Sequence, residues 1–536
     1  MRKPLCLPYA CPVFTTMTTT AATANVRARP PLPRQIPYII VTEGCERFSF
    51  YGMRNILTPF LVSTLLLYLP LDERALAAKD VFHTFVIGVY FFPLLGGWFA
   101  DRFWGKYHTV LWLSMVYVAG HACLALFDDS RTGFYSGLFL IALGSGGIKP
   151  LVSAFVGDQF DSSNKHRAKL VYDGFYWIIN FGSFFASLLM PLFLRDLGPA
   201  VAFGIPGALM ALALVVFWLG RRRYVRVAPT PPNPHSLLHV ARTALMARDD
   251  GQARPGLWIA GIGVAAAAVA LATIPRLGFV IGACLALGAL LVFGGIGTAM
   301  QLERARGTHP DTAVDGVRGV LRVLVVFALV TPFWSLFDQK ASTWVLQGAA
   351  MAKPAWFHEA QMQALNPILV LLLIPFNNLA LFPLMRRVGL EPTALRRMGA
   401  GIALAALAWV AAGTLQLALD GGNAVSIAWQ ILPYALLTLG EVLVSATGLE
   451  FAYSQAPPSM KGSIMSFWML AVTFGNLWVL LANAGVRNDA VTGWIAATGL
   501  GETAFLMFFF AGFAALTALA FALYARHYPM RDYYRA

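Results

Sequence analysis

The chain has 536 residues, of which 58% are hydrophobic and only 12% charged, and its mean hydropathy is +0.64. Soluble domains contain about 45–50% apolar and about 25% charged residues, so this composition excludes an ordinary soluble enzyme and favours an all-α polytopic membrane protein. The net charge of +14 is also typical of proteins that bind nucleic acids, which is an alternative function to consider. The five cysteines are scattered and contain no C-x-x-C pair, which indicates neither a disulfide framework nor a zinc site: Cys6, Cys11, Cys45, Cys123 and Cys284.

Fourteen apolar stretches, each long enough to cross a bilayer, follow one another along the chain. The segment before them lacks the sustained apolar run of a signal peptide and reads as a tail, with Met17 as an alternative start to Met1. Charged or Pro/Gly-rich segments separate the stretches, which cover residues 38–69, 81–100, 107–127, 133–155, 170–194, 200–220, 256–274, 277–299, 318–348, 361–385, 398–419, 427–453, 461–484 and 502–526.

The basic residues are distributed unequally between the two sides of these spans. One set of alternate connections, which includes both tails, holds 28 Lys and Arg residues, and the other set holds seven. By the positive-inside rule, both termini are expected in the cytoplasm, and the surplus charge is a signal for membrane insertion. The distribution therefore argues against nucleic acid as a partner.

The polar segment 222–255 separates six spans from the rest of the chain and is interpreted as a cytoplasmic linker. The two spans after it contain almost no ionisable residue, as expected of a hairpin that faces lipid. Paired six-helix bundles with a site at their interface are a transporter architecture. The expected organisation is a tail 1–37, a bundle 38–221, the linker, a hairpin 256–300, a second bundle 301–526 and a tail 527–536.

Charged side chains inside spans are costly and point to function. In the first span, polar residues recur at helical spacing and form one stripe: Glu43, Glu46, Arg47, Tyr51 and Arg54. Further candidates occur on other spans: His83, Tyr90, Lys149, Asn180, Asp338, Lys340, Asn366, Glu441 and Glu450. A structural alternative is that Glu43 and Arg47 simply neutralise each other. Mutual neutralisation does not explain ionisable groups on so many spans.

These residues lie in motifs with a family resemblance. The segment EGCERFSFYGMRNIL (43–57) resembles the first-helix signature E-x-x-E-R-F-x-x-Y-G of the proton-dependent oligopeptide transporter family, which belongs to the major facilitator superfamily. Further segments resemble family signatures in family order: GWFADRFWGK (97–106), GSGGIKPLVSAFVGDQF (144–160), FYWIINFGS (175–183), PFWSLFDQKAS (332–342) and GEVLVSATGLEFAYSQAP (440–457). The inserted hairpin resembles that of prokaryotic members, which implies a bacterial inner-membrane protein with the superfamily fold and 14 helices.

The resemblance implies that the cargo is a di- or tripeptide, a zwitterion that needs a positive and a negative pole in its site. It assigns the peptide carboxylate to Arg54 and Lys149, with Tyr51 and Tyr90 alongside. It assigns the amino terminus to Glu441, assisted by Asn180 and Asn366, with Ser445 one helical turn on. Trp334 and Phe333 would supply an apolar wall.

The resemblance also implies symport with protons, and no other cofactor is expected. The chain has no phosphate-binding loop that would couple transport to ATP. Proton-coupling and gating roles fall on Glu43, Glu46, Arg47, His83, Asp338 and Lys340. We hypothesise that Arg54 pairs with Asp338 across the two halves and that protonation of Asp338 releases Arg54 for the peptide. His83 has the alternative role of a hydrogen-bond donor between helices.

Three local departures from the family pattern affect the ninth span. Phe337 and Asp338 stand where many bacterial members have a Glu pair, and Lys340 stands where a neutral residue is usual. Animal members have an Arg at the position of Thr343. Of the roles that the resemblance implies, the salt bridges of this span therefore have the weakest match to the family pattern.

Three other functions compete with peptide transport for a chain of this kind. An intramembrane enzyme lacks its motifs, since HEAQM (358–362) has no second histidine for H-E-x-x-H. A channel would need a repeated filter element. The same fold with another cargo, such as nitrate, another anion or a peptide-like drug, remains as the alternative, although a simple anion would not require Glu441. The expected partners are peptides, protons and the lipid bilayer, without an obligatory protein partner.

Overall fold

The computed structural model describes residues 32–161, 164, 167–229, 231, 233–247, 253–455 and 460–530. Most of the N-terminal tail with Met17, Cys6 and Cys11, and the last six residues, lie outside this range. The described part of the chain is helical and has no strand; its only extended pairings are two isolated bridges. In a bilayer, a helix satisfies its own backbone hydrogen bonds, which is why apolar stretches of this length fold this way.

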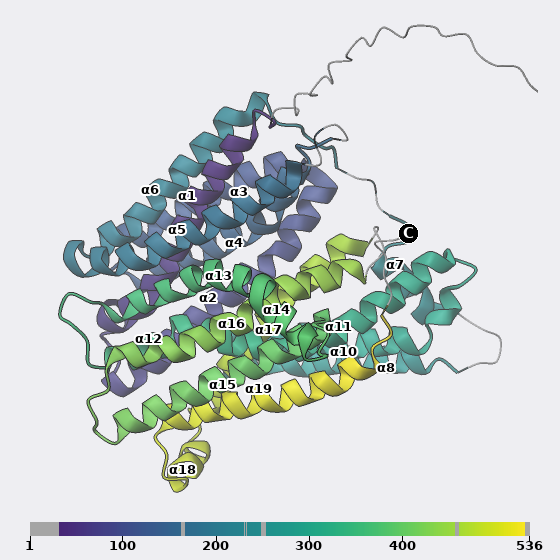
Figure 1. Cartoon of the computed structure of the whole chain (residues 1–536). Helices are drawn as coiled ribbons and strands as arrows, with labels where there is room; N and C mark the ends of the chain where they lie inside the picture. Colours follow the sequence, from purple (N-terminus) through teal and green to yellow (C-terminus); the bar gives the residue numbers. More distant parts are fainter. Residues whose placement is uncertain are drawn as a thin grey trace, which may run out of the picture.

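The first half of the molecule contains six long helices, drawn in purple to blue in Figure 1. Their apolar faces meet in one buried core, where the ring of Phe60 lies 4.8 Å from that of Phe134 and 4.9 Å from that of Phe203. The helices are α1 (Ile36–Phe60), α2 (Leu71–Phe99), α3 (Gly105–Leu126), α4 (Arg131–Gly157), α5 (Ala168–Leu197) and α6 (Pro199–Leu219).

The linker contains a helix, α7 (Leu237–Met246), that was not predicted from the sequence. Its Val240 and Ala244 are fully buried against the second half. The side chain of Gln301 donates to the carbonyls of Ala244 and Leu245, both at 2.9 Å. The linker is therefore docked on the second half. Helix α7 has only ten residues, two of them buried, so its apolar periodicity is too weak to predict the helix from the sequence.

The inserted hairpin is formed by α8 (Pro255–Ala272), the single turn α9 (Ile274–Leu277) and α10 (Phe279–Met300). Gly256 and Gly297 bring the two long helices into backbone contact, since a Cβ at Gly256 would lie 2.2 Å from the carbonyl oxygen of Gly297. The hairpin packs beside both halves: Cys284 of α10 belongs to one apolar cluster with Ile87 of α2 and Leu477 from the second half.

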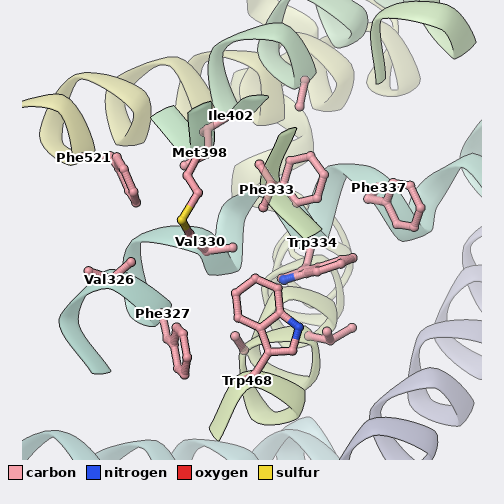
Figure 2. Packing of buried hydrophobic residues seen from close by; sticks show 14 of the residues in the cluster. Val326, Phe327, Val330, Phe333, Trp334, Phe337, Met398, Ile402, Trp468 and Phe521 are labelled. Carbon is pink, nitrogen blue, oxygen red and sulfur yellow. The ribbon is translucent and has the colours of Figure 1, made fainter. Parts of the chain in front are cut away.

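The second half is larger and has more breaks (Figure 1). Its core lies between α11, α15, α17 and α19, and Figure 2 shows Trp334 beside Trp468, with Val330, Met398 and Phe521 in the same cluster. The helices are α11 (Asp311–Asp338), α12 (Thr343–Ala349), α13 (Leu365–Phe376), α14 (Phe382–Arg387), α15 (Ala394–Asp420), α16 (Ile431–Ser454), α17 (Lys461–Gly485), α18 (Asp489–Ala497) and α19 (Glu502–His527).

The expected span 318–348 is not one continuous helix. It is broken after Asp338 by the short 3₁₀ turn η6 (Gln339–Ala341), which leads into α12. Carbonyl groups at the break find new partners, since Tyr434 donates its hydroxyl to the carbonyl of Lys340 at 3.2 Å and Thr58 to that of Ala341 at 2.8 Å. The break therefore places Asp338 and Lys340 beside irregular backbone, and its hydrogen bonds come from distant helices.

By length and composition, twelve helical ranges of the described chain could cross a membrane. One of them, Glu73–Leu126, includes both α2 and α3. Helix α1 is not among the twelve, and it carries the four charges of the first-span stripe. With α1 added and α2 separated from α3, the helices match the fourteen spans expected from the sequence.

The two halves meet along a seam that includes α1, α2 and α5 on one side and α11, α13 and α17 on the other. We call the end of the bundle opposite the start of α1 and the end of α19 the distal end; it carries the connections 66–70, 350–358 and 421–426. Near it, hydrogen bonds join the halves: Arg54 to Asp338, Thr58 to Ala341, Gln361 to Leu188, Gln363 to Asn55, and both Asn483 and Arg487 to Asp80. The distal end is closed in this structure.

Close packing of α11 against α17 leads to a testable prediction. A Cβ at Gly475 would lie 2.5 Å from the Cβ of Trp334 and 2.8 Å from the carbonyl oxygen of Thr331. We expect Gly475→Ala to destabilise the protein by about 1–3 kcal/mol, the usual cost of an overpacked core. Thermal unfolding of the purified protein in detergent measures this. Gly462→Ala on the same helix is the control, because nothing lies within 4 Å of a Cβ there; equal melting temperatures for the two variants would contradict the prediction.

Candidate functional site

The polar stripe of α1 is buried inside the first half. The Nε of Arg47 lies 3.1 Å from Oε1 of Glu43 and also pairs with Oε2 of Glu46. All three side chains are at least nine-tenths buried. One guanidinium therefore serves two carboxylates, and a simple neutral pair of Glu43 and Arg47 does not describe the cluster. When both carboxyl groups are ionised, the three side chains carry a net charge of one negative unit.

Further along α1, Arg54 reaches across the seam. Its Nη2 donates to Oδ1 of Asp338 at 2.6 Å, and both side chains are buried. The other carboxylate oxygen of Asp338 accepts from Nδ2 of Asn476 on α17 at 2.8 Å. Each carboxylate oxygen of Asp338 therefore has a donor in this closed arrangement, one a guanidinium and the other an amide.

His83 lies next in the same chain of hydrogen bonds. Its Nδ1 is 2.6 Å from Oδ1 of Asn476, and its Nε2 is 2.9 Å from the hydroxyl of Ser342. Since the Nδ2 of Asn476 already donates to Asp338, its Oδ1 is the acceptor, and the hydrogen belongs on Nδ1 of His83. Asn476 thus stands between His83 and Asp338, and a neutral His83 has both ring nitrogens satisfied.

Glu441 lies on α16, on the other side of the seam from Arg54. Its Oε2 accepts a 2.6 Å hydrogen bond from Nδ2 of Asn366, and the same Nδ2 lies 3.1 Å from the hydroxyl of Thr438. Glu441 keeps partial exposure. A carboxylate with an amide donor and no salt bridge among the described residues is available to bind a cation.

Two lysines of the site lie against aromatic rings. The Nζ of Lys149 is 3.7 Å from the ring centroid of Phe50 and 4.8 Å from that of Tyr90, and the Nζ of Lys340 is 3.3 Å from the ring of Phe337. In the described part of the chain, neither ammonium group forms a salt bridge with a carboxylate. Cation–π contacts stabilise such charges while leaving donors free for a ligand.

Several residues expected at the site lie elsewhere or contact other groups than those expected from the sequence. Nδ2 of Asn180 donates within its own helix to the carbonyl of Tyr176 at 2.9 Å, and no hydrogen bond of the described chain joins it to Glu441. Trp334 and Phe333 are buried in the core of the second half, as Figure 2 shows for Trp334. Tyr51 and Ser445 are partly exposed. Phe333 was expected to form an apolar wall of the site, but the ring that contacts a charged group there is that of Phe337, beside Lys340.

Sequence reasoning missed Asn476, Ser342 and Thr438, which connect the expected residues to one another. Asn476 carried a usable signal, because an amide in the middle of an apolar span is rare and costly without partners. Ser342 and Thr438 carried none, since small hydroxyl residues are common in membrane helices and bond to their own backbone. Glu450, counted among the intramembrane charges, is exposed and lies 3.8 Å from Arg397.

Comparison with known proteins identifies the family. The POT family model matches residues 107–491. Among curated relatives, solute carrier family 15 member 2 of rabbit (Oryctolagus cuniculus) is 32% identical over 435 residues, which are 76% of this chain and 53% of the relative. Peptide transporter 3 of Caenorhabditis elegans is 31% identical over 478 residues, 85% of this chain and 60% of the relative. The chain spans about half the length of the curated relatives it matches.

Solved structures extend the match to the three-dimensional level. The crystal structure of an auto inhibited POT family peptide transporter is 67% identical, with a TM-score of 0.92, and the alignment covers 94% of this chain and 99% of that one. The POT family transporter PepTSo is 66% identical with a TM-score of 0.92, over 94% and 100% of the two chains. The relatives matched are transporters and not enzymes. This chain is a multi-pass membrane protein with the major facilitator superfamily fold, and it belongs to the POT family.

Proposed function

We propose that the protein imports di- and tripeptides together with protons across the bacterial inner membrane by alternating access. The two six-helix bundles, 38–221 and 301–526, would rock about the seam, with both termini in the cytoplasm and the distal end facing outward. In this orientation the structure described above is closed to the outside. The likeness to a solved POT family peptide transporter at 67% identity supports peptides as the cargo.

The observation that carries this proposal is the pair of opposite poles at the seam. Arg54 and Lys149 in the first half offer N–H donors for a peptide carboxylate, with Tyr51 and Tyr90 beside them, and Glu441 with Asn366 in the second half offers an acceptor for the amino terminus. Lys149 and Glu441 are both without a salt bridge among the described residues, so each charge has capacity for a ligand. An extended tripeptide places its charges up to about 10 Å apart.

Proton coupling is proposed to act through groups that lie beside the poles. Arg54 cannot hold a peptide carboxylate and Asp338 equally well, so protonation of Asp338 would release the guanidinium for substrate and loosen the closed distal end. Glu43, Glu46 and Arg47 form a second group in which an extra carboxylate can accept a proton. His83 would respond to the protonation of Asp338 through Asn476, whose amide bonds to both side chains. Lys340 would adjust the charge near Glu441.

Uptake into proteoliposomes tests the proposal. A labelled dipeptide should accumulate when an inward proton gradient is imposed, and an uncoupler should abolish the accumulation. Failure of the gradient to drive uptake in a correctly folded preparation would contradict symport with protons.

Competition in the same assay defines the cargo. Unlabelled dipeptides and tripeptides should inhibit uptake, whereas a pentapeptide separates the two charges too far and a free amino acid holds them too close. Nitrate should not compete, because it has no group for Glu441. Inhibition by nitrate as strong as that by a dipeptide would favour the alternative cargo, a simple anion, on the same fold.

A further inference from the structure

At the distal end, a short 3₁₀ helix, η7 (Glu359–Ala364), is wedged between the two halves. It contacts α1 and α5 of the first half as well as α12 and α13 of the second. Two of its glutamines bond across the seam: Nε2 of Gln361 donates to the carbonyl of Leu188 at 2.8 Å, and Nε2 of Gln363 to that of Asn55 at 3.1 Å. This turn is part of the closure of the distal end.

His358 caps this helix. Its ring Nδ1 accepts a hydrogen bond from the backbone N–H of Ala360 at 3.2 Å, and its own backbone N–H donates to Oε1 of Gln361 at 2.8 Å. The Gln361 side chain is therefore held at one end by His358 while its other end bonds to α5. An Nδ1 that accepts a hydrogen bond carries no hydrogen, so the cap requires the neutral imidazole.

A cavity of about 340 Å³ lies beside this cap and is lined from both halves. The first half contributes Ser63, Thr64 and Arg195, and the second contributes Leu346, His358 and Glu359. The His358 ring is therefore at a place where the halves are imperfectly packed and would separate when the distal end opens. Water reaches such a ring on opening and is largely kept from it on closing.

The charged groups around His358 come from both sides of the seam. Oε1 of Glu359 lies 3.8 Å from Nδ1, and the Nζ of Lys353 lies 3.4 Å from the other oxygen of Glu359. From the end of α5, Arg195 pairs with Asp196 at 2.7 Å and donates to the carbonyls of Ala355 and Trp356 at 3.4 and 3.3 Å. Burial lowers the pKa of His358; Glu359 opposes this shift, and Lys353 and Arg195 reinforce it.

We propose that His358 is a positioning residue of the outer gate, whose neutral ring holds η7 and Gln361 in the closed arrangement and whose protonation releases them. This inference rests on the alternating-access transport proposed above. A proton added to Nδ1 replaces the acceptor with a donor that faces the N–H of Ala360, and the cap is lost. Without the cap, the backbone N–H of His358 that orients Gln361 toward Leu188 is held less firmly, because the turn loses one of its hydrogen bonds and keeps the 2.9 Å bond from the N–H of Gln361 to the carbonyl of His358.

The direction of the pH effect follows from linkage. Opening exposes the ring to water, where the pKa of histidine is about 6.5, while the closed state keeps the pKa lower. The open state therefore binds more protons, and acidification favours it. If only the open state protonates, the ratio of open to closed molecules rises up to about tenfold between pH 7.5 and 5.5. An acidic exterior would thus open the gate on the side from which peptide and protons enter.

Distance measurements between spin labels test this inference without any substrate. Labels at the exposed Leu197 and Asn423, in a cysteine-free background, report the separation of the halves at the distal end. The protein is placed in nanodiscs with the same pH on both sides, and the distance distribution is recorded from pH 7.5 to 5.5. The readout is conformational and needs no peptide or gradient. A negative result here with successful transport would therefore count against the gate alone, and a positive result here without transport would count against the proposed function alone.

Two variants separate the cap from the mere presence of the histidine. His358→Asn keeps a side-chain acceptor suited to a helix N-cap but does not titrate, so the distal end should open less on acidification than in the wild type. The response that remains is the one assigned above to Asp338. His358→Ala has no acceptor, so the open fraction should be raised at every pH. His108→Asn, at an exposed histidine on the opposite end of the bundle, should respond as the wild type does.

Three results would overturn the inference. The first is a wild-type distance distribution that does not change with pH, and the second is a response in His358→Asn that is as large as that of the wild type. The third is an identical closed distribution for His358→Asn and His358→Ala, which would mean that the cap does not hold the gate. Matching melting temperatures for the two variants would show that a difference between them reflects the gate and not the stability of the fold.

Discussion

Replacement of Glu441 by Gln is expected to weaken dipeptide binding by roughly ten- to a hundredfold. A hydrogen bond to a charged group contributes about 1.5–3 kcal/mol, and each 1.4 kcal/mol corresponds to a factor of about ten in affinity. Glutamine keeps the size of the side chain and an oxygen that can accept from Nδ2 of Asn366, the 2.6 Å contact of the native carboxylate. The variant should therefore fold normally and lose only the negative pole for the amino terminus.

Binding of a dipeptide to the purified protein by calorimetry, together with the concentration dependence of uptake, measures this effect. Glu450→Gln is a matched control on the same helix, because Glu450 is exposed and paired loosely with Arg397. A derivative of the dipeptide with a blocked amino terminus should bind wild type and Glu441→Gln with similar, weak affinity. Equal affinity of both proteins for the unblocked dipeptide would remove Glu441 from the proposed site.

Replacement of Asp338 by Asn is expected to uncouple transport from the proton gradient. Uptake driven by the gradient should fall toward the level of simple exchange, and its dependence on external pH should flatten between pH 5.5 and 7.5. The reason is that an amide cannot take up the proton that would release Arg54 from its 2.6 Å contact. Exchange of labelled for unlabelled peptide, which needs no net proton movement, should persist.

The measurement compares gradient-driven uptake with exchange in the same proteoliposomes. Removal of one partner of a buried ion pair costs about 3–5 kcal/mol in stability, so melting temperatures accompany the kinetics. Asp338→Glu restores an ionisable group and should regain part of the pH dependence, and Asp420→Asn, at an exposed carboxylate, serves as the control. An unchanged pH profile in Asp338→Asn would contradict the coupling role.

Some of the site was accessible from the sequence because it depends on local pattern. The spacing of Glu43, Glu46, Arg47 and Arg54 predicts one polar face on any helix, and the structure places all four on α1 with buried side chains. Individual partners were not accessible in the same way. Arg54 and Asp338 are 284 residues apart in the chain and His83 and Asn476 are 393 apart, so their contacts depend on how the halves dock.

Where a side chain could point in two directions, the sequence did not decide between them. Asn180 was expected beside the amino-terminal pole, but its amide donates to its own helix. Trp334 was expected at the surface of the cavity, but it packs beside Trp468 because Gly475 leaves room for it between α11 and α17. A small residue on one helix decides how closely an aromatic ring on a neighbouring helix can approach. A glycine and a ring that meet in this way are far apart in the sequence, so no periodic pattern reveals the contact.

The sequence by itself determined the helical, membrane-spanning class, the number of spans, the family and the ionisable residues that lie inside the spans, because composition, hydropathy and motifs act locally along the chain. The tertiary structure decided which groups are neighbours: the bridge of Asn476 between His83 and Asp338, the helix break after Asp338, the docking of α7, and the capped turn at His358. These features depend on close packing between distant segments, where shifts of an ångström make or break a hydrogen bond.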